Sequence, residues 1–292
     1  MEPSLTAKLA LGTVQFGLDY GIKNPRGRVP ENEVAAILKL AATAGVRMLD
    51  TSSAYGSAEE VLGRVLAGGT ECFDLVSKLA KGAVEGIDRQ IELTYRRLGV
   101  QQLYGYLCHH FDFYLAQPAV WERLRRLKVD GRVRKIGFSL YHPAEVKTLF
   151  DQGVTPDIIQ VPYSVLDRRF EPLLAECGRR GIEVHVRSIF LQGLLLCAPE
   201  AVPVHFQPLR NRIAKLRDAS EAAGVTPAQL LLVWTCQRPG ISRVVIGVDS
   251  QADLELNLAA ADLAERVRPH LAALDEMSEA DERLILPTHW PK

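Results

Sequence analysis

Residues 46–56, VRMLDTSSAYG, join a short apolar run to a polar connection that carries a tyrosine. The run VRMLD has the near-continuous apolar character of a strand buried on both faces, and Asp50 closes it. Tyr55 lies five residues further on, and a helix-like segment from Ala58 to Leu66 follows. This unit therefore predicts a strand, a polar group at the end of that strand, and a helix.

The same order recurs twice further along the chain. Lys78 closes the run FDLVSK and His109 closes the run LYGYLCH, and each run precedes another helix-like segment. In a parallel β/α barrel the carboxyl ends of all strands meet at one face, where catalytic groups collect. We therefore expect Lys78 and His109 to converge with the aspartate and the tyrosine. Four ionisable groups in that arrangement indicate a proton-transfer site.

Strand-like and helix-like segments alternate along the sequence and predict an α/β fold, the (β/α)8 TIM barrel. The predicted strands are AKLALGT (7–13), VRMLD (46–50), FDLVSK (73–78), LYGYLCH (103–109), VRKIGFS (133–139), PDIIQV (156–161), IEVHVRS (182–188) and SRVVIG (242–247). The predicted helices are 30–45, 58–66, 86–98, 118–128, 143–150, 170–180, 227–237 and 250–260. No GxGxxG signature follows the first strand, which disfavours an open dinucleotide-binding sheet. We expect residues 1–292 to form a single domain with an extra C-terminal helix.

Two loops and the C-terminal tail are longer than the minimal repeat requires. They are Phe16 to Arg28, Leu191 to Gln207, and the residues from Ala264 onward. Loops on the C-terminal face of a barrel carry binding function, so these stretches and Phe111 to Gln117 are expected to form the substrate walls. The aromatic residues expected in these walls are Phe16, Phe111 and Phe190.

The composition is that of a soluble globular protein: 47% of the residues are hydrophobic, and 35 basic residues balance 35 acidic ones. A net charge of zero gives no electrostatic reason to expect nucleic acid or an anionic membrane as a partner. The five cysteines include no CxxC pair, which favours a reducing compartment over a disulfide framework. The sequence shows no leader-like start and no apolar stretch of about 18 residues, so we expect a cytoplasmic protein. Its oligomeric state does not follow from the sequence.

Proton transfer to a carbonyl oxygen is chemistry that the four strand-end residues can perform together. The ammonium of Lys78 would favour the phenolate of Tyr55 and lower the pKa of this phenol from about 10. Asp50 would keep Lys78 protonated and oriented. A neutral His109 would donate a hydrogen bond to the carbonyl oxygen. This combination fits a carbonyl that accepts a hydride on carbon and a proton on oxygen.

Two other kinds of site fit the pattern less well. His109 and His110 are adjacent, so on a strand their side chains would point to opposite faces and could not bind one metal ion. Cys108 would point away from His109 for the same reason, which disfavours a nucleophilic Cys/His pair. No HxH or HxxxH pair occurs in the sequence, and we expect no metal.

The sequence resembles the aldo-keto reductase superfamily over nearly its whole length. The resemblance rests on DTSSAYG (50–56), SK (77–78), the strand-end His109, IGFS (136–139), IIQVPYS (158–164), RSIFLQGLLL (187–196) and VIGVDSQADLELNLAA (245–260). It implies a barrel enzyme that uses NADP(H) or NAD(H) to interconvert an aldehyde, ketone or sugar carbonyl with its alcohol. It also implies a catalytic tetrad, with Tyr55 as the general acid and base. The tetrad consists of Asp50, Tyr55, Lys78 and His109.

The same resemblance implies a set of cofactor-binding residues. Ser139 and Gln160 would bind the nicotinamide carboxamide, and residues 188–194 would cover the pyrophosphate. Residues 12–14 would line the nicotinamide pocket, and part of 250–257 would lie near the adenosine half. The full set is Gly12, Thr13, Val14, Asp50, Ser139, Gln160, Arg187, Ser188, Phe190, Gln192, Gly193, Leu194, Gly247, Ser250, Gln251 and Asn257.

Departures from the family pattern concern the binding of both the substrate and the cofactor. Leu140 stands where an asparagine often follows the serine, and Arg187 stands where an aromatic residue commonly stacks on the nicotinamide. A guanidinium is planar and can stack, but it also adds charge near the substrate. The positions that often carry cations for the 2′-phosphate of NADP(H) hold Gly247, Asp249 and Asp253. We therefore expect weak discrimination between the two cofactors unless Arg243 supplies the missing cation.

Two alternative functions stay open from the sequence. One is a redox sensor or regulatory subunit, in which the barrel binds a dinucleotide and turnover is incidental. The other is a barrel aldolase or isomerase in which Lys78 forms a Schiff base. That chemistry needs a lysine with a lowered pKa, whereas a neighbouring Asp50 acts in the opposite direction.

Overall fold

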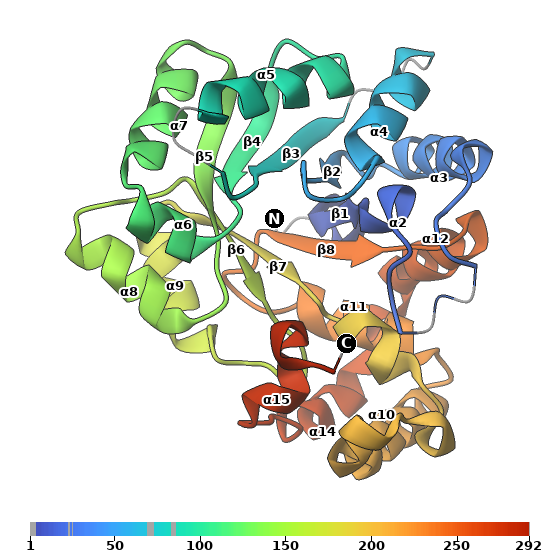
Figure 1. The fold of residues 1–292 in the computed structure, drawn as a ribbon. Helices are drawn as coiled ribbons and strands as arrows, with labels where there is room; N and C mark the ends of the chain where they lie inside the picture. The colour runs from blue at the N-terminus through green and yellow to red at the C-terminus, as the bar shows by residue number, and fades with distance from the viewer. Residues whose placement is uncertain (1–3, 23, 25, 69–72, 83–85, 292) are drawn as a thin grey trace.

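The computed structural model describes residues 4–22, 24, 26–68, 73–82 and 86–291. Its centre is a closed barrel of parallel strands in the order β1 to β8, with β8 paired back to β1 (Figure 1). The strands are β1 (Leu9–Gly12), β2 (Met48–Asp50), β3 (Asp74–Leu79), β4 (Leu103–Cys108), β5 (Val133–Ser139), β6 (Ile158–Pro162), β7 (Glu183–Arg187) and β8 (Arg243–Gly247). The predicted (β/α)8 barrel is confirmed.

Helices surround the barrel and connect its strands (Figure 1). The α-helices up to the last strand and just after it are α1 (Leu5–Lys8), α2 (Val14–Gly17), α3 (Glu31–Thr43), α4 (Ala58–Ala67), α5 (Ile87–Leu98), α6 (Phe111–Ala116), α7 (Ala119–Val129), α8 (Pro143–Asp151), α9 (Glu171–Arg179), α10 (Arg210–Ala222), α11 (Pro227–Cys236) and α12 (Gln251–Leu258). The connection after β7 also contains the 3₁₀ helices η2 (Leu191–Leu196), η3 (Pro199–Ala201) and η4 (Val204–Leu209). The connection between β7 and α10 is therefore long and contains three short 3₁₀ helices.

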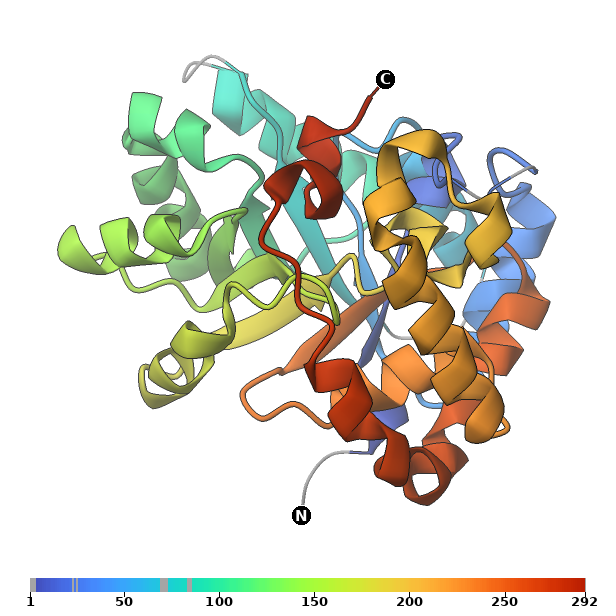
Figure 2. The same cartoon turned by 90° about the horizontal axis from the view of Figure 1, so that it is seen from below.

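The C-terminal tail forms short helices rather than one long helix. They are η5 (Ala259–Leu263), α13 (Ala264–Val267), η6 (Arg268–His270), α14 (Leu271–Asp275), α15 (Glu282–Ile285) and η7 (Pro287–His289). In Figure 2 this red segment runs from the side of the N-terminus along the barrel to the opposite end, where α15 lies. Among the described residues, no helix is long and apolar enough to cross a membrane.

Strand periodicity explains why polar residues point into the mouth of the barrel. Side chains two residues apart on a strand share one face, and the interior of the barrel is filled by one layer of apolar residues. That layer is Ala10, Met48, Val76, Leu107, Ile158 and Val245. The residues two positions further along, at the carboxyl ends, are Gly12, Asp50, Lys78, His109, Gln160 and Gly247. The same alternation that packs the core thus gathers these residues at one mouth.

Several local predictions differ from the structure. The first strand begins at Leu9, because residues 5–8 form helix α1. The predicted wall residues Phe16 and Phe111 pack in the hydrophobic core, where they are 0% and 8% exposed. Of the five cysteines, Cys72 lies outside the described residues.

Gly17, the last residue of α2, lies directly against the loop that carries Tyr55. A Cβ atom at Gly17 would lie 1.9 Å from the Tyr55 carbonyl oxygen and 2.4 Å from the Ala58 backbone nitrogen. Gly56 makes the reciprocal approach: its φ is +56°, and its Cβ would lie 2.4 Å from the Gly17 carbonyl oxygen. These two glycines let α2 pack closely against the backbone of Tyr55 and of the residues that follow it.

Gly17→Ala is expected to lower kcat by about 10²-fold, since a shift of about 1 Å in a reacting group has an effect of that size. The methyl group cannot fit unless the Tyr55 loop moves. Initial rates and a thermal melt of the variant measure both consequences. The control is Gly178→Ala in α9, because a Cβ at Gly178 meets nothing within 4 Å. Wild-type kcat in Gly17→Ala would show that the loop can move without harm.

Candidate active site

A cavity of about 610 Å³ opens at the carboxyl ends of the strands. Three of the four predicted catalytic residues, Asp50, Tyr55 and His109, line it, and Lys78 lies directly beneath them at 0% exposure. The lining residues are Gly12, Thr13, Val14, Gln15, Tyr20, Gly21, Asn24, Asp50, Tyr55, His109, Tyr141, Arg187, Ser188, Ile189, Phe190, Gln192, Gly193, Leu196, Thr226, Pro227, Ala228, Val245, Ile246, Gly247, Val248, Asp249, Asp253, Leu256 and Asn257. The structure therefore brings the predicted residues of distant strands together.

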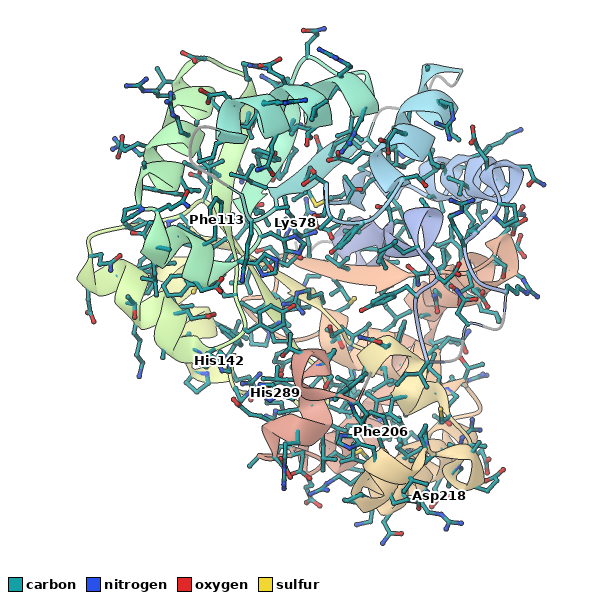
Figure 3. The ribbon with its side chains drawn as sticks, in the orientation of Figure 1. Lys78, Phe113, His142, Phe206, Asp218 and His289 are labelled. Carbon is teal, nitrogen blue, oxygen red and sulfur yellow. The ribbon has the colours of Figure 1, made fainter. Side chains whose placement is uncertain are left out.

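Lys78, labelled in Figure 3, contacts both Asp50 and Tyr55 of this group. Its Nζ donates to Asp50 Oδ1 at 2.6 Å, to the Thr51 carbonyl at 2.9 Å and to the Tyr55 hydroxyl at 3.4 Å. These three acceptors match the three donors of an ammonium group. Burial acts to lower the pKa of Lys78, but Asp50 and Tyr55 outweigh it, and the pKa lies above its ordinary value. Lys78 is therefore a permanent cation beside the phenol, which argues against a Schiff-base lysine.

Tyr55 differs in one respect from the sequence prediction. Burial raises the pKa of its phenol, and Lys78 offsets only part of that effect, so the net pKa lies above the ordinary value. The prediction of a lowered pKa was wrong, because the effect of burial on the phenol outweighs that of one cation. Tyr55 is consequently protonated at neutral pH and can act as an acid.

His109 completes the group through a contact with Tyr55. Its ring meets the Tyr55 ring edge-on, with 5.9 Å between centroids. Burial, with help from Lys78, lowers the pKa of His109 to about 2, so the imidazole is neutral. Its Nδ1 lies 3.0 Å from the hydroxyl of Ser52, which already accepts the N–H of Ala54. If the Ser52 hydroxyl donates to Nδ1, the proton of the imidazole resides on Nε2. Sequence reasoning missed Ser52, although it lies within DTSSAYG.

The buried neutral His109 predicts a loss of stability in mild acid. Its pKa is about 2 when folded and 6.5 in the reference state, so the unfolded chain binds the proton first. The contribution of His109 to the free energy of unfolding is complete above pH 6.5. It falls as the pH drops below that value, by at most about 1.4 kcal/mol per pH unit. Urea denaturation of wild type at pH 6.5 and at pH 5 should show this loss, and His109→Gln should reduce it. His289→Gln, at an exposed position, is the control. Equal losses in wild type and His109→Gln would contradict the expectation.

The strand argument predicted that the side chains of His109 and His110 point to opposite faces. In the structure they do not. Their rings stack, with 4.7 Å between centroids. The reason is that β4 ends at Cys108, so strand alternation no longer places His110 on the face opposite His109. Cys108 is buried, which raises the pKa of its thiol to about 12, and its Sγ donates to the His110 carbonyl. Within the described part of the chain, no group of three or more His, Cys, Asp or Glu residues could hold a metal ion.

Many of the predicted cofactor residues lie in the cavity wall. They are Gly12, Thr13, Val14, Asp50, Arg187, Ser188, Phe190, Gln192, Gly193, Gly247 and Asn257. Gln160 is buried beneath the wall, where its Nε2 donates to Asp50 Oδ2 at 2.7 Å. Its Oε1 and the hydroxyl of Thr13 are buried and have no partner among the described residues. Buried polar atoms without a partner, close to a cavity, fit the binding of a polar ligand there.

The remaining predicted cofactor residues have other contacts. Ser139 is buried and does not line the cavity, and Leu194 packs in the core. Ser250 caps α12 by accepting the Asp253 N–H, and Gln251 donates to Glu255. Sequence motifs placed these residues near the site, but they did not show which side chains reach it.

The segment after β7 reaches the segment after β1 across the cavity. The Ile22 N–H donates to the Gln192 carbonyl at 2.9 Å. Ser188, Leu191 and Gln192 all have positive φ, between 46° and 64°. Non-glycine residues seldom adopt this conformation, and such residues cluster at ligand-binding sites. Tyr20 and Gly21, which line the cavity from the other side, were not singled out from the sequence.

The end of the cavity after β8 is acidic. Asp249 and Asp253 line it, and burial, with the Asp253 charge, raises the pKa of Asp249. Arg243, the residue considered as a compensating cation, is the first residue of β8 and pairs in register with His185. It therefore lies at the amino end of the strand, whereas the cavity is at the carboxyl end. Arg243 accordingly does not line this end of the cavity.

The chain is similar to known proteins over most of its length. The model of the Aldo/keto reductase family matches residues 8–279. An aldo-keto reductase from Mycobacterium sp. (strain JLS) is 30% identical over 268 residues, with 86% of this chain and 87% of the relative covered. The NADH-specific methylglyoxal reductase of Escherichia coli (strain K12) is 28% identical over 278 residues, with 82% of each covered.

Solved structures show the same fold. An aldo-keto reductase from Bacillus halodurans in its holo form superimposes with a TM-score of 0.75 at 21% identity, covering 95% of both chains. A point variant of Gox0644 in complex with NADPH gives a TM-score of 0.68 at 23% identity, covering 94% of this chain and 90% of the other.

Proposed function

This chain belongs to the aldo/keto reductase family and is an NAD(P)H-dependent oxidoreductase, and from this premise we propose that it interconverts an aldehyde, ketone or sugar carbonyl with its alcohol through Tyr55. The observation that carries the proposal is the position of Lys78 Nζ, which contacts both Asp50 and the Tyr55 hydroxyl. A buried cation bonded to a phenol at the edge of a cavity is an arrangement for moving one proton.

The carbonyl carbon would accept a hydride, which is the chemistry that a reduced nicotinamide supplies when it is bound. Tyr55 gives its proton to the carbonyl oxygen, and the Lys78 ammonium stabilises the phenolate that remains. Asp50 holds Lys78 in place and keeps it charged. His109, neutral and with Nε2–H directed to the substrate, donates a hydrogen bond to the same oxygen and orients it. The reverse sequence oxidises an alcohol.

The cofactor would be held by residues from several strand ends. The Gln160 Oε1, buried and without a partner among the described residues, can accept an N–H of the carboxamide, and Ser139 lies beside it on the next strand. Residues 188–194, which include Ser188, Leu191 and Gln192 with positive φ, would cover the pyrophosphate. Asn257, with Ser250 and Gln251, would lie near the adenosine half.

The test is a rate measurement with NADH and NADPH against a panel of aldehydes, ketones and sugars, followed by the absorbance of the reduced nicotinamide. We expect carbonyl-dependent oxidation of at least one cofactor. Fluorescence quenching gives the cofactor affinity independently. Tight cofactor binding without reduction of any carbonyl would favour the alternative, a dinucleotide-binding redox sensor.

Cofactor discrimination is expected to be weak: NADPH over NADH by less than about 100-fold, or about 2.7 kcal/mol. A 2′-phosphate normally needs a Lys or Arg within hydrogen-bonding distance, whereas Asp249 and Asp253 line this end of the cavity. Asp253→Arg should strengthen NADPH binding more than NADH binding, measured by quenching. Glu255→Arg, an equal charge change on the exposed side of α12, is the matched control. A thousandfold preference for NADPH in the wild type would mean that a different cation binds the phosphate.

A further inference from the structure

Arg187 is a cation at the catalytic end of the cavity. It is the last residue of β7 and lines the cavity together with Tyr55 and His109. Its charge acts on both of these residues: it contributes to lowering the Tyr55 pKa and the His109 pKa. The guanidinium is therefore close to the place where a carbonyl would react.

Its contacts within the protein leave its charge uncompensated. The guanidinium lies over the Tyr141 ring, 4.3 Å from the centroid, and Nη2 donates to the Leu140 carbonyl at 3.4 Å. No carboxylate among the described residues forms an ion pair with Arg187. An arginine has five N–H donors, and a stacked guanidinium keeps its edge available to a planar anion.

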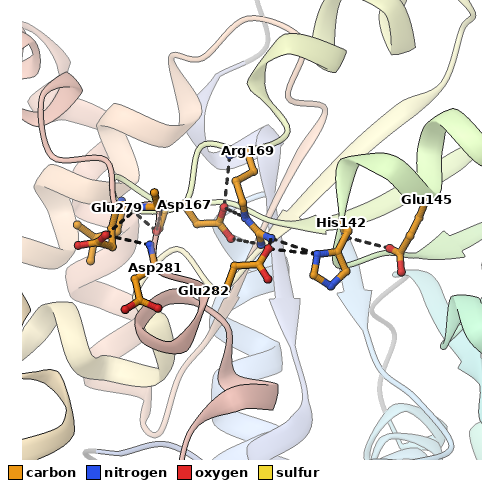
Figure 4. A network of polar contacts seen from close by, with 10 residues as sticks. His142, Glu145, Asp167, Arg169, Glu279, Asp281 and Glu282 are labelled. Atoms are coloured by element: carbon orange, nitrogen blue, oxygen red, sulfur yellow. Dashed lines mark hydrogen bonds and ion pairs between the residues drawn. The ribbon is translucent and has the colours of Figure 1, made fainter.

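The support under Arg187 is fixed in position. A carboxylate oxygen of Glu145 accepts the backbone N–H groups of Tyr141 and His142, at 2.7 and 2.9 Å. His142 Nδ1 lies 3.3 Å from Glu282 of α15, and Arg169 joins Glu282 to Asp167 (Figure 4). The loop that carries Tyr141 is thus tied to two other connections. A guanidinium on such a support loses little freedom when it binds a ligand.

The other charges at this end cancel or are absent. Asp50 is paired with Lys78, and His109 is neutral. The two further carboxylates in the described lining, Asp249 and Asp253, follow β8 at the adenosine end. The catalytic end therefore carries a net positive charge, which favours anionic over neutral substrates.

We propose that Arg187 binds an anionic group of the substrate, so that the enzyme acts on carbonyl compounds that also carry a carboxylate or a phosphate. This inference rests on the proposed function and deepens it. The two anions share the chemistry that a guanidinium recognises, namely a pair of oxygen acceptors on one centre. Tyr141 is a positioning residue in this arrangement, because its ring supports the guanidinium that binds the anion.

The experiment compares pairs of related carbonyl substrates of which one carries an anionic group and the other is neutral. Succinic semialdehyde is paired with its methyl ester, glucuronate with glucuronamide, and glyceraldehyde phosphate with glyceraldehyde. The first two pairs test a carboxylate and the third tests a phosphate. For at least one pair, the wild type is expected to show kcat/KM at least about tenfold higher for the anion, the scale of a hydrogen bond to a charged group.

Variants assign that preference to the guanidinium. Arg187→Met should lower kcat/KM for the preferred anion by about 10- to 100-fold and change the neutral partner by less than about threefold. Arg187→Lys keeps the charge but loses the paired N–H donors of the guanidinium, so it should retain part of the preference for the anionic substrate. Tyr141→Leu should reduce the preference while the charge stays. Arg210→Met, which removes an exposed arginine at the start of α10, is the control for net charge.

Two further measurements separate a role of Arg187 in substrate binding from a role in cofactor binding. They are the affinity for NADH and the binding of an unreactive anion. If Arg187→Met lowers kcat/KM equally for both partners and weakens NADH binding, Arg187 serves the cofactor and the inference is wrong. If the wild type reduces no compound, the proposed function fails. Binding of succinate against succinamide to the protein with NADH then decides the inference. Succinate binding that Arg187→Met abolishes would support it, and equal weak binding of both would overturn it.

Discussion

Tyr55→Phe is expected to lower kcat by at least about 10²-fold, the lower range for loss of a general acid, while cofactor affinity stays nearly unchanged. The phenylalanine ring fills the same space but has no proton to give. Because the Tyr55 pKa lies above its ordinary value, the wild-type phenol is protonated over the whole neutral range. The loss should therefore appear at every pH from 6 to 8, in single-turnover rates as well as in kcat.

Tyr20→Phe is the matched control for this result. Tyr20 also lines the cavity, but the contacts of Lys78 are with Asp50, Thr51 and Tyr55. Removing the Tyr20 hydroxyl should leave the proton-transfer step intact. Carbonyl reduction by Tyr55→Phe at a near wild-type rate would end the assignment of Tyr55 as the acid.

Lys78→Met is expected to be comparably harmful and to destabilise the fold as well. The phenolate of Tyr55 would lose its stabilising charge, so kcat should fall by at least about 10²-fold. Asp50, whose side chain is 5% exposed, would be left without its partner. Removing one member of a buried ion pair costs about 3–5 kcal/mol. Steady-state kinetics and urea denaturation measure the two effects.

A double variant separates these two effects of Lys78. Lys78→Met combined with Asp50→Asn removes both charges of the buried pair, so most of the lost stability should return while activity does not. If Lys78→Met kept full activity and His109 variants lost it, the four-residue site would need a different assignment of roles.

Much of the fold and of the candidate site followed from two regularities of the sequence. Near-continuous apolar runs located the strands, and the alternation of side chains placed Asp50 and Lys78 inward at one end of the barrel. Their contact at 2.6 Å agrees with that reasoning. Arg243 could have been placed correctly by the same rule, because it begins its strand rather than ends it.

Other features depend on three-dimensional surroundings that no local pattern records. The Tyr55 pKa depends on how completely the chain covers the phenol, and the stacking of His109 on His110 depends on where β4 stops. Phe16 was expected in a cavity wall, but α2 turns it into the core. Tyr141 and Ser52 act through contacts with residues far away in sequence, so their part in the site became visible only in the fold.

The residues around this cavity differ in how far they tolerate substitution. The backbone of Tyr55 and of the residues just after it packs against Gly17, and no side chain larger than hydrogen fits at Gly17 or Gly56 without a shift. Among the other residues of the cavity wall, Tyr20 comes from the connection after β1 and Phe190 from the connection after β7. Selection for a new substrate can therefore exchange wall residues in many combinations while Tyr55 keeps its place. A directed-evolution library should accordingly vary the wall and leave the two glycines untouched.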